Sequence, residues 1–204
     1  MKTEVVSSTS PHAIRRALEI LQSGGLVAFP TDTVYGVGAL AFDQRAIESI
    51  YAAKDRPVEK AIPVLIGDKD DLAKVADDVP LVALRLIDRF WPGPLTVLVP
   101  KKATLPEAIS ATSTVGVRVP DHEVARGLLR LAGPMAVTSA NISGQASPIT
   151  ARQVLAQLGG RIAMIIDGGE TPGGIPSTLV DCIGTEIQIL REGSISKDEL
   201  LSAV

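Results

Sequence analysis

The chain has 204 residues, of which 46% are hydrophobic and 3% aromatic, and a formal net charge of −3. This length and hydrophobic content predict a folded globular protein with a substantial core, and they exclude a disordered chain. The acidic balance argues against a protein that binds nucleic acid over its whole surface, although it leaves room for a local basic groove.

The first residues carry no apolar signal region, and no apolar run approaches the roughly 18 residues that a membrane span needs. We therefore expect a cytoplasmic protein that does not associate with membranes. Cys182 is the only cysteine, which excludes an intrachain disulfide, and its apolar neighbours favour a buried structural thiol over a nucleophile.

Helical and strand patterns alternate along the chain. Ser10 is expected to be the N-cap, and Pro11 the first residue, of a helix that ends at Gly24-Gly25. A strand over 26–29 follows, and then a helix that Asp43 caps and that ends near Lys54. The later elements are a strand over 62–66, a helix over 81–90, strands over 95–99 and 115–119, a helix over 121–131, a strand over 135–138, a helix over 150–158, strands centred on Ile165, Leu179 and Ile189, and a helix over 197–201. This order predicts one α/β domain over residues 1–204, with helices around a mixed sheet.

Two segments in the first third of the chain favour a site for a phosphorylated small molecule. The loop Pro30-Thr31-Asp32-Thr33-Val34-Tyr35-Gly36 is rich in hydroxyl groups, and a cluster of cations, Lys54, Arg56 and Lys60, follows about 20 residues later, after a helix. Phosphate oxygens need positive charge and hydrogen-bond donors together. The simplest alternative for the cation cluster is an exposed, solvated turn.

The common nucleotide, metal and triad motifs are absent from the sequence. There is no P-loop signature, and a loose dinucleotide fingerprint that begins at Gly36 lies too far from the preceding strand. His12 and His122 are the only histidines, and no cluster with metal-ligand spacing accompanies them, so we predict no protein-bound metal. No nucleophile elbow supports serine catalysis.

Further polar groups follow the later strands. The segment Thr138-Ser139-Ala140-Asn141-Ile142-Ser143 comes after a buried strand, Pro176-Ser177-Thr178 opens another, and Arg191 closes the next. Such residues are common in ordinary loops, but ligands of open α/β sheets bind outside strand ends. Their convergence at one edge of the sheet would form a binding site.

The full set of motifs resembles the YrdC-type threonylcarbamoyl-AMP synthase family. Seven motifs occur in the family's order, namely Pro-Thr-Asp-Thr-Val-Tyr-Gly from Pro30, Lys-x-Arg-Pro from Lys54, Trp-Pro-Gly-Pro-Leu-Thr from Trp91, Val-Arg-Val-Pro from Val117, Ser-x-Asn from Ser139, Pro-Ser-Thr from Pro176 and Arg-x-Gly from Arg191. The resemblance extends over nearly the whole chain, from about Ser10 to Leu200.

The resemblance implies an enzyme that forms threonylcarbamoyl-adenylate and pyrophosphate from L-threonine, bicarbonate and ATP with Mg²⁺. It implies a twisted mixed sheet with a concave basic face. The product would pass to the machinery that transfers threonylcarbamoyl groups to tRNA, and weak tRNA binding is a further expectation. N-carboxylated threonine is a weak oxyanion nucleophile that must approach a polyanion, so cations are needed to screen it and the leaving pyrophosphate.

The resemblance also assigns residues to the two substrates. Lys54 and Arg56 would be catalytic. The expected threonine ligands are Thr31, Arg118, Thr138 and Ser177, and the expected ATP ligands are Lys54, Arg56, Thr114, Ser139, Ala140, Asn141, Ser147 and Arg191. The planar fork of Arg118 suits the threonine carboxylate better than a lysine would.

One departure from the family concerns the threonine pocket. Many relatives have a histidine in the strand after the cation cluster, where this chain has Leu65. This departure affects part of the expected threonine pocket. Two alternatives to the synthase stay open: a non-catalytic module that binds double-stranded RNA or tRNA on the basic concave face, and a paralogue with different carbamoyl-adenylate chemistry. Longer relatives carry an appended C-terminal domain that we do not expect within these 204 residues.

Overall fold

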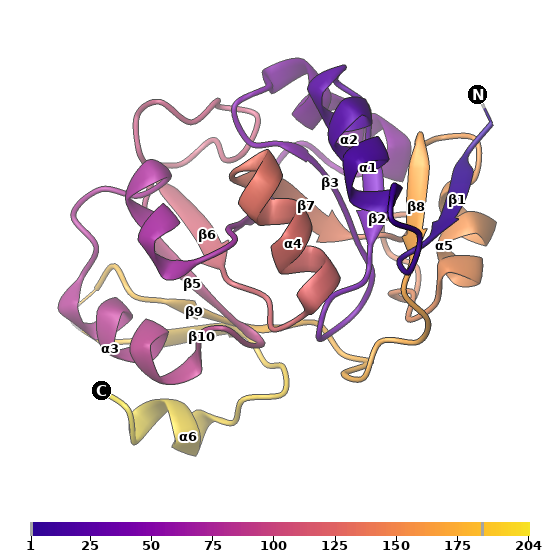
Figure 1. Ribbon diagram of the computed structural model, residues 1–204. Coiled ribbons are helices and arrows are strands. Elements are labelled where there is room, and N and C mark those ends of the chain that lie inside the picture. Colours follow the sequence, from indigo (N-terminus) through magenta and orange to yellow (C-terminus); the bar gives the residue numbers. More distant parts are fainter. Residues whose placement is uncertain (1, 185) are drawn as a thin grey trace.

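The computed structural model describes residues 2–184 and 186–204 and shows one continuous ten-stranded mixed sheet with helices packed on it (Figure 1). The strands lie in the order β1-β8-β2-β3-β7-β4-β6-β5-β9-β10, with four parallel and five antiparallel neighbouring pairs. The α/β class and the mixed sheet predicted from the sequence are therefore confirmed.

The bounds of the elements are as follows. The strands are β1 (Glu4–Ser7), β2 (Val27–Phe29), β3 (Gly36–Leu40), β4 (Val64–Leu65), β5 (Leu95–Pro100), β6 (Thr114–Arg118), β7 (Met135–Ser139), β8 (Met164–Asp167), β9 (Thr178–Asp181) and β10 (Gln188–Arg191). The helices are α1 (Ala13–Gln22), α2 (Gln44–Lys54), the 3-10 helix η1 (Lys69–Lys74), α3 (Leu81–Phe90), α4 (Glu123–Ala132), α5 (Ala151–Leu158) and α6 (Lys197–Leu201).

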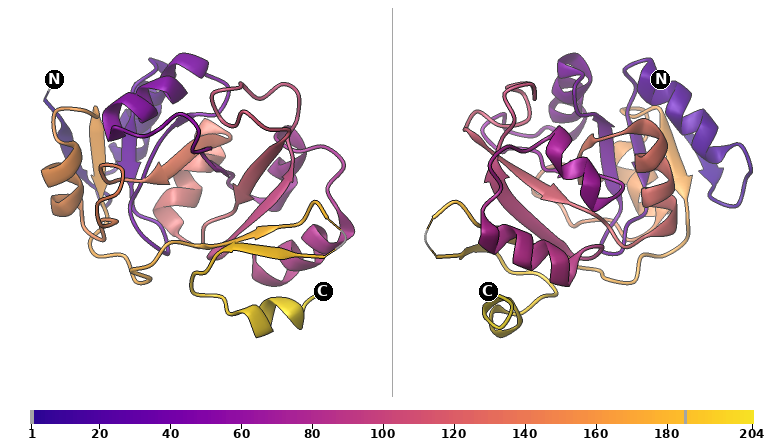
Figure 2. Two further views of the ribbon diagram at one scale, coloured as in Figure 1. Left: turned by 180° about the vertical axis from the view of Figure 1, so that it is seen from behind. Right: turned by 60° about the vertical axis from the view of Figure 1, so that its left-hand side comes forward.

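Alternating residues of the strands supply two hydrophobic clusters. Ala28, Ala136 and Ile165 belong to the larger cluster, to which α2, α3 and α5 contribute. Their strand neighbours, such as Phe29 and Met135, belong to a smaller cluster with α1 and α4. The views from the front and from behind show α1 and α4 on one side of the sheet and α2 and α5 on the other (Figures 1 and 2).

The sheet is bent, so that its two halves lie at an angle to each other (Figure 2, left). Strands β3 and β7 lie on one side of the bend, and β5, β6 and β9 lie on the other (Figure 2, left). In the second half, Val97, Val117 and Val180 point into the main core. Their neighbours therefore face the opposite way, toward the bend.

Strands β1 and β3 and helix η1 are not expected from the sequence. Residues 36–40 read as a loop because of Gly36 and Gly38, yet the strand needs these glycines where β7 approaches. A Cβ atom on Gly38 would lie 2.7 Å from the Ala136 carbonyl oxygen, and one on Gly36 would lie 2.7 Å from Val137 Cγ1. The expected start of α1 is also wrong, since the helix begins at Ala13 and His12 occupies its N-cap.

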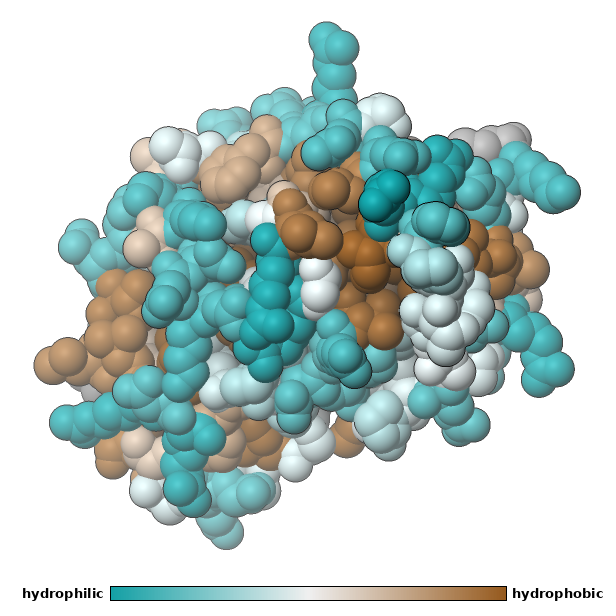
Figure 3. Space-filling view, in the orientation of Figure 1, coloured by the Kyte–Doolittle hydropathy of each residue, from teal (hydrophilic) through white to brown (hydrophobic). Residues whose placement is uncertain are grey.

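Among the described residues, none of the helices is sufficiently long and apolar to span a bilayer. On the face shown in Figure 3, polar residues separate small apolar areas. The two ends of the chain lie on opposite sides of the molecule, with the N-terminus beside β1 and the C-terminus after α6 (Figure 1).

Candidate active site

A cavity of about 280 Å³ lies in the bend of the sheet. Seven of the twelve residues that the sequence predicts for the site line it: Thr31, Arg56, Arg118, Thr138, Ser139, Ser177 and Arg191. They come from the loop before β3, the turn after α2, and strands β6, β7 and β10, and from the residue before β9. The predicted convergence of polar groups from separate strand ends is thus present.

The loop between β2 and β3 forms one wall of the cavity and is held by its own hydroxyl groups. Thr31 Oγ1 donates to the Val34 carbonyl oxygen at 2.7 Å and accepts from the Thr33 amide at 3.2 Å. Both threonine side chains are almost fully buried. The loop is therefore shaped before any ligand binds, since its local side-chain to backbone bonds fix its turn.

Arg118 lies at the floor of the cavity and is only 5% exposed. Its Nε donates to the Gly93 carbonyl oxygen at 3.0 Å, its Nη1 to Thr33 Oγ1 at 3.0 Å, and its Nη2 to Asp32 Oδ1 at 2.5 Å. Burial lowers the pKa of Arg118, and the Asp32 carboxylate opposes that change. A guanidinium has five N–H groups, so two remain for a ligand while three hold it in place.

Ser177 and Arg191 form the wall on the far side of the bend. Arg191 donates from Nε to the Ser177 carbonyl oxygen at 3.0 Å and from Nη2 to Ser177 Oγ at 3.1 Å. Ser177 Oγ and Thr96 Oγ1 are 2.8 Å apart. These contacts join β5, β9 and β10 at the cavity edge.

Three arginine side chains give the cavity a positive character. Arg56 Nε donates to the Lys60 carbonyl oxygen and its Nη2 to the Ala61 carbonyl oxygen, which holds it at the rim. Loss of solvent lowers the pKa of Arg191, and the charges of Arg118 and Arg56 lower it further. No aspartate or glutamate occurs among the described residues that line the cavity, so the site favours an anion.

Lys54 is buried, in contrast to a cation of an exposed, solvated turn. It is 1% exposed, does not line the cavity, and donates from Nζ to the carbonyl oxygens of Ser139 and Asn141. Burial, with the nearby Arg56 charge, lowers the pKa of Lys54 to about 7. The alternative of a solvated turn is therefore wrong for Lys54, whereas its expected contact with ATP stays a prediction.

Four other predicted ATP ligands also lie outside the cavity lining: Thr114, Ala140, Asn141 and Ser147. Thr114 begins β6, at the opposite end of the strand from Arg118, and its Oγ1 lies 2.9 Å from Thr112 Oγ1. Ala140 is fully buried and its amide donates to the Tyr35 carbonyl oxygen. Asn141 follows directly, 6% exposed, so the Ser139–Asn141 segment reaches from the cavity into the protein.

The structure adds residues that the sequence reasoning did not single out. Thr96 alternates in β5 with the buried Leu95 and Val97, a pattern that could have marked it as a polar group on the inner face of the bend. Asp32 and Thr33 belong to the predicted loop, but only the fold shows that they hold Arg118 from 85 or more residues away. Leu65, at which the sequence departs from the expected family pattern, lines the cavity.

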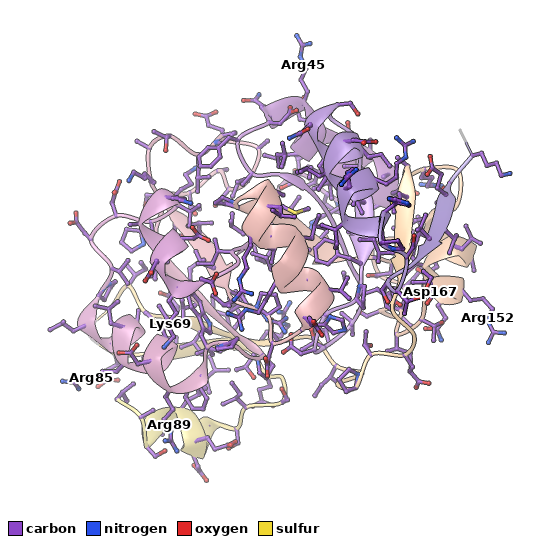
Figure 4. The ribbon with its side chains drawn as sticks, in the orientation of Figure 1. Arg45, Lys69, Arg85, Arg89, Arg152 and Asp167 are labelled. Carbon is purple, nitrogen blue, oxygen red and sulfur yellow. The ribbon has the colours of Figure 1, made fainter. Side chains whose placement is uncertain are left out.

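A second hollow, of about 540 Å³, lies between the start of α2 and the end of α4. Phe42, Arg45 and Ala132 are among its lining residues, and none of the predicted site residues belongs to it. Arg45 and Arg152 extend from the surface into solvent, in contrast to the arginines of the cavity (Figure 4). Within the described residues, no three His, Cys, Asp or Glu side chains are grouped as metal ligands.

Comparison with known proteins places this geometry in a family. The family model described as telomere recombination (Sua5, YciO and YrdC) matches residues 19–193. A threonylcarbamoyl-AMP synthase of Pyrococcus abyssi is 43% identical over 189 residues, which cover 92% of this chain and 56% of that protein. A threonylcarbamoyl-AMP synthase of Vibrio cholerae is 34% identical over 184 residues, covering 88% of this chain and 97% of its own length.

A solved structure shares the fold at similar identity. The crystal structure of Pyrococcus abyssi Sua5 in complex with L-threonine matches with a TM-score of 0.95 and 40% identity, over 100% of this chain and 61% of that one. This chain thus spans less than two thirds of the first relatives that it matches. The matched range, the identities and the common fold together show that the chain belongs to the Sua5/YciO/YrdC family.

Proposed function

We propose that the protein is a threonylcarbamoyl-AMP synthase, which forms threonylcarbamoyl-adenylate and pyrophosphate from L-threonine, bicarbonate and magnesium-bound ATP. The observation that carries the proposal is the cavity itself, in which Arg56, Arg118 and Arg191 converge beside a row of hydroxyl groups with no lining carboxylate among the described residues. The similarity to synthases of known name, including one of nearly this length, supports it.

The chemistry fits these residue types. The carbamate of threonine attacks the α-phosphorus of ATP, the bond to the bridging oxygen breaks, and pyrophosphate leaves with the electron pair. Both partners are anions, so fixed guanidinium groups that lower their repulsion stabilise the transition state. No protein nucleophile is needed, and Cys182, which is buried and whose pKa is raised to about 12, has no part in the reaction.

The two substrates divide the cavity between them in this proposal. Threonine lies near Thr31, Arg118, Thr138 and Ser177, where the free N–H groups of Arg118 pair with its carboxylate. ATP lies toward Arg56, Ser139 and Arg191 and extends past Asn141, with Thr114, Ala140 and Ser147 as further candidate contacts. The complex of the Pyrococcus abyssi relative with L-threonine supports an amino-acid subsite.

The product is an activated acyl-adenylate, and we infer that it passes to the machinery that modifies tRNA, in the cytoplasm. We also infer that residues 1–204 act as a single domain, because all ten strands belong to one sheet. Weak binding of tRNA stays a prediction.

Pyrophosphate release tests the proposal. With ATP, Mg²⁺, bicarbonate and threonine, release should be continuous, and omission of either threonine or bicarbonate should stop it. Release that does not depend on threonine would favour the paralogue with different carbamoyl-adenylate chemistry. Serine should be tested as a second amino acid substrate. Leu65, which departs from the expected family pattern, lies on the cavity wall where the amino acid would bind.

A further inference from the structure

The buried lysine at the end of α2 has no function in the proposed chemistry as a direct ligand. A buried ammonium costs several kcal/mol unless it is paired, and an apolar residue of similar volume is often more stable at such a position. In the structure, Lys54 Nζ has only the carbonyl oxygens of Ser139 and Asn141 as partners, and it forms no ion pair with an acidic residue among the described ones. Retention of a lysine here therefore calls for a functional reason.

The helix end that carries Lys54 is fixed from the far side. Arg161 Nη1 donates to the Ala53 carbonyl oxygen at 3.2 Å and to Asp55 Oδ2 at 2.7 Å. Asp55 itself adopts a left-handed conformation with φ of 50°, which ends the helix and turns the chain toward Arg56 at the cavity rim. The base of the Lys54 side chain is thus part of a rigid support.

The segment after β7 receives its main contacts from this support. In addition to the two bonds from Nζ, the Ser143 amide donates to the Lys54 carbonyl oxygen at 2.8 Å. Other parts of the chain contact the same turn as well: the main-chain carbonyl oxygen of Tyr35 accepts from the Ala140 amide, and the Gln157 side-chain Oε1 accepts from the Ile142 amide at 3.0 Å. The Lys54 side chain contacts both ends of the Ser139–Asn141 segment, through the carbonyl oxygens of Ser139 and Asn141.

We propose that Lys54 is a positioning residue whose side-chain nitrogen holds the Ser139–Asn141 main chain in the conformation that forms the nucleotide end of the cavity. The inference rests on the proposed function for the identity of that ligand. Ser139 lines the cavity and its carbonyl oxygen points back to Lys54, so the nitrogen acts from behind the wall. Even a neutral amine keeps two N–H donors for the two carbonyls, so the contact does not require a charge.

Lys54→Met tests the proposal, because methionine has a similar length and lacks the donors. Lys197→Met is the control, since Lys197 is an exposed lysine at the start of α6, outside the cavity lining. Hydrogen exchange of the 139–143 segment in the free protein should accelerate in Lys54→Met and not in Lys197→Met. Calorimetry should show the Kd for ATP raised at least tenfold, while the Kd for threonine changes by less than about twofold. Lys54→Gln, which keeps an N–H₂ group on a shorter chain, should lie between Lys54→Met and wild type in both measurements.

Several outcomes would overturn the inference in whole or in part. Unchanged exchange together with lost ATP binding would make Lys54 a direct phosphate ligand. Faster exchange throughout the protein, or equal losses for ATP and threonine, would make its role merely structural. Failure of the wild-type protein to bind ATP would refute the proposed function and the nucleotide part of this inference, while the exchange comparison would still decide whether Lys54 holds the segment.

Discussion

Replacement of Arg118 by lysine separates the geometry of the guanidinium from its charge. In the structure three of its N–H groups are bound, to Gly93, Thr33 and Asp32, over distances of 3.0, 3.0 and 2.5 Å. These acceptors come from two different loops, so one ammonium can satisfy one of them well and a second poorly. A hydrogen bond from a charged donor contributes about 1.5–3 kcal/mol.

The loss of one such bond and the weakening of a second predict a free energy of unfolding lower by about 2–4 kcal/mol. A domain of this kind has about 5–15 kcal/mol, so the variant should still fold. The variant also loses the planar pair of N–H groups with which Arg118 could bind a carboxylate in a bidentate manner. This loss should weaken threonine binding by about 10–100-fold. ATP affinity should stay nearly unchanged, because the charge near Arg191 is kept.

Urea unfolding and calorimetric titration of each ligand measure these effects. Arg126→Lys is the matched control, because Arg126 donates to the Gly67 carbonyl and to Asp68, outside the cavity. The control should bind both substrates like the wild type. Equal losses for threonine and ATP in Arg118→Lys would place Arg118 on the nucleotide, and wild-type binding of both would refute its assignment as a carboxylate ligand.

Three further predictions concern charge and burial. Arg56→Ala should slow adenylate formation by about 10²-fold, because a positive charge that stabilises the transition state is lost, while unfolding in urea should be almost unchanged. A rate near that of the wild type would show that Arg56 does not contribute to catalysis. The folded-state pKa of Lys54, about 7, lies below its usual 10.5, so between these values the unfolded chain binds more protons and the free energy of unfolding should rise with pH. Urea titrations should show this rise in Lys197→Met and not in Lys54→Met, and identical slopes would contradict the prediction. The Cys182 thiol, with its pKa raised to about 12 by burial, should react with a thiol reagent at pH 8 only after unfolding, and rapid reaction in the native protein would show that the thiol is accessible.

The helices and most strands could be predicted because their apolar spacing records which face is buried. Helix α3 has the expected bounds of Leu81–Phe90, and Asp43 caps α2 by accepting from the Ala46 amide. Strand β3 was not predictable in the same way, since Gly36 and Gly38 are signals for a turn in any local reading. They are needed because of the approach of β7, which lies about a hundred residues later in the chain.

The site shows the same division between local and distant causes. Motif order predicted Arg118, Ser177 and Arg191, and the fold brings all three to one cavity. The burial of Lys54 depends on carbonyl groups 85 and 87 residues away, so no pattern around the lysine could distinguish it from a solvated cation. Ser139, Ala140, Asn141 and Ser147 stay predicted ATP contacts; Ser139 lines the cavity, whereas Ala140 and Asn141 are buried next to it.

Detection of the adenylate itself tests whether the protein is a threonylcarbamoyl-AMP synthase. The protein would be incubated with ATP, Mg²⁺, threonine and isotope-labelled bicarbonate, and the nucleotides would be separated and analysed by mass spectrometry. A synthase should produce an adenylate whose mass includes one threonine and one labelled carbonyl group, formed together with pyrophosphate. An adenylate without the label, or pyrophosphate release with no threonine in the product, would contradict this assignment.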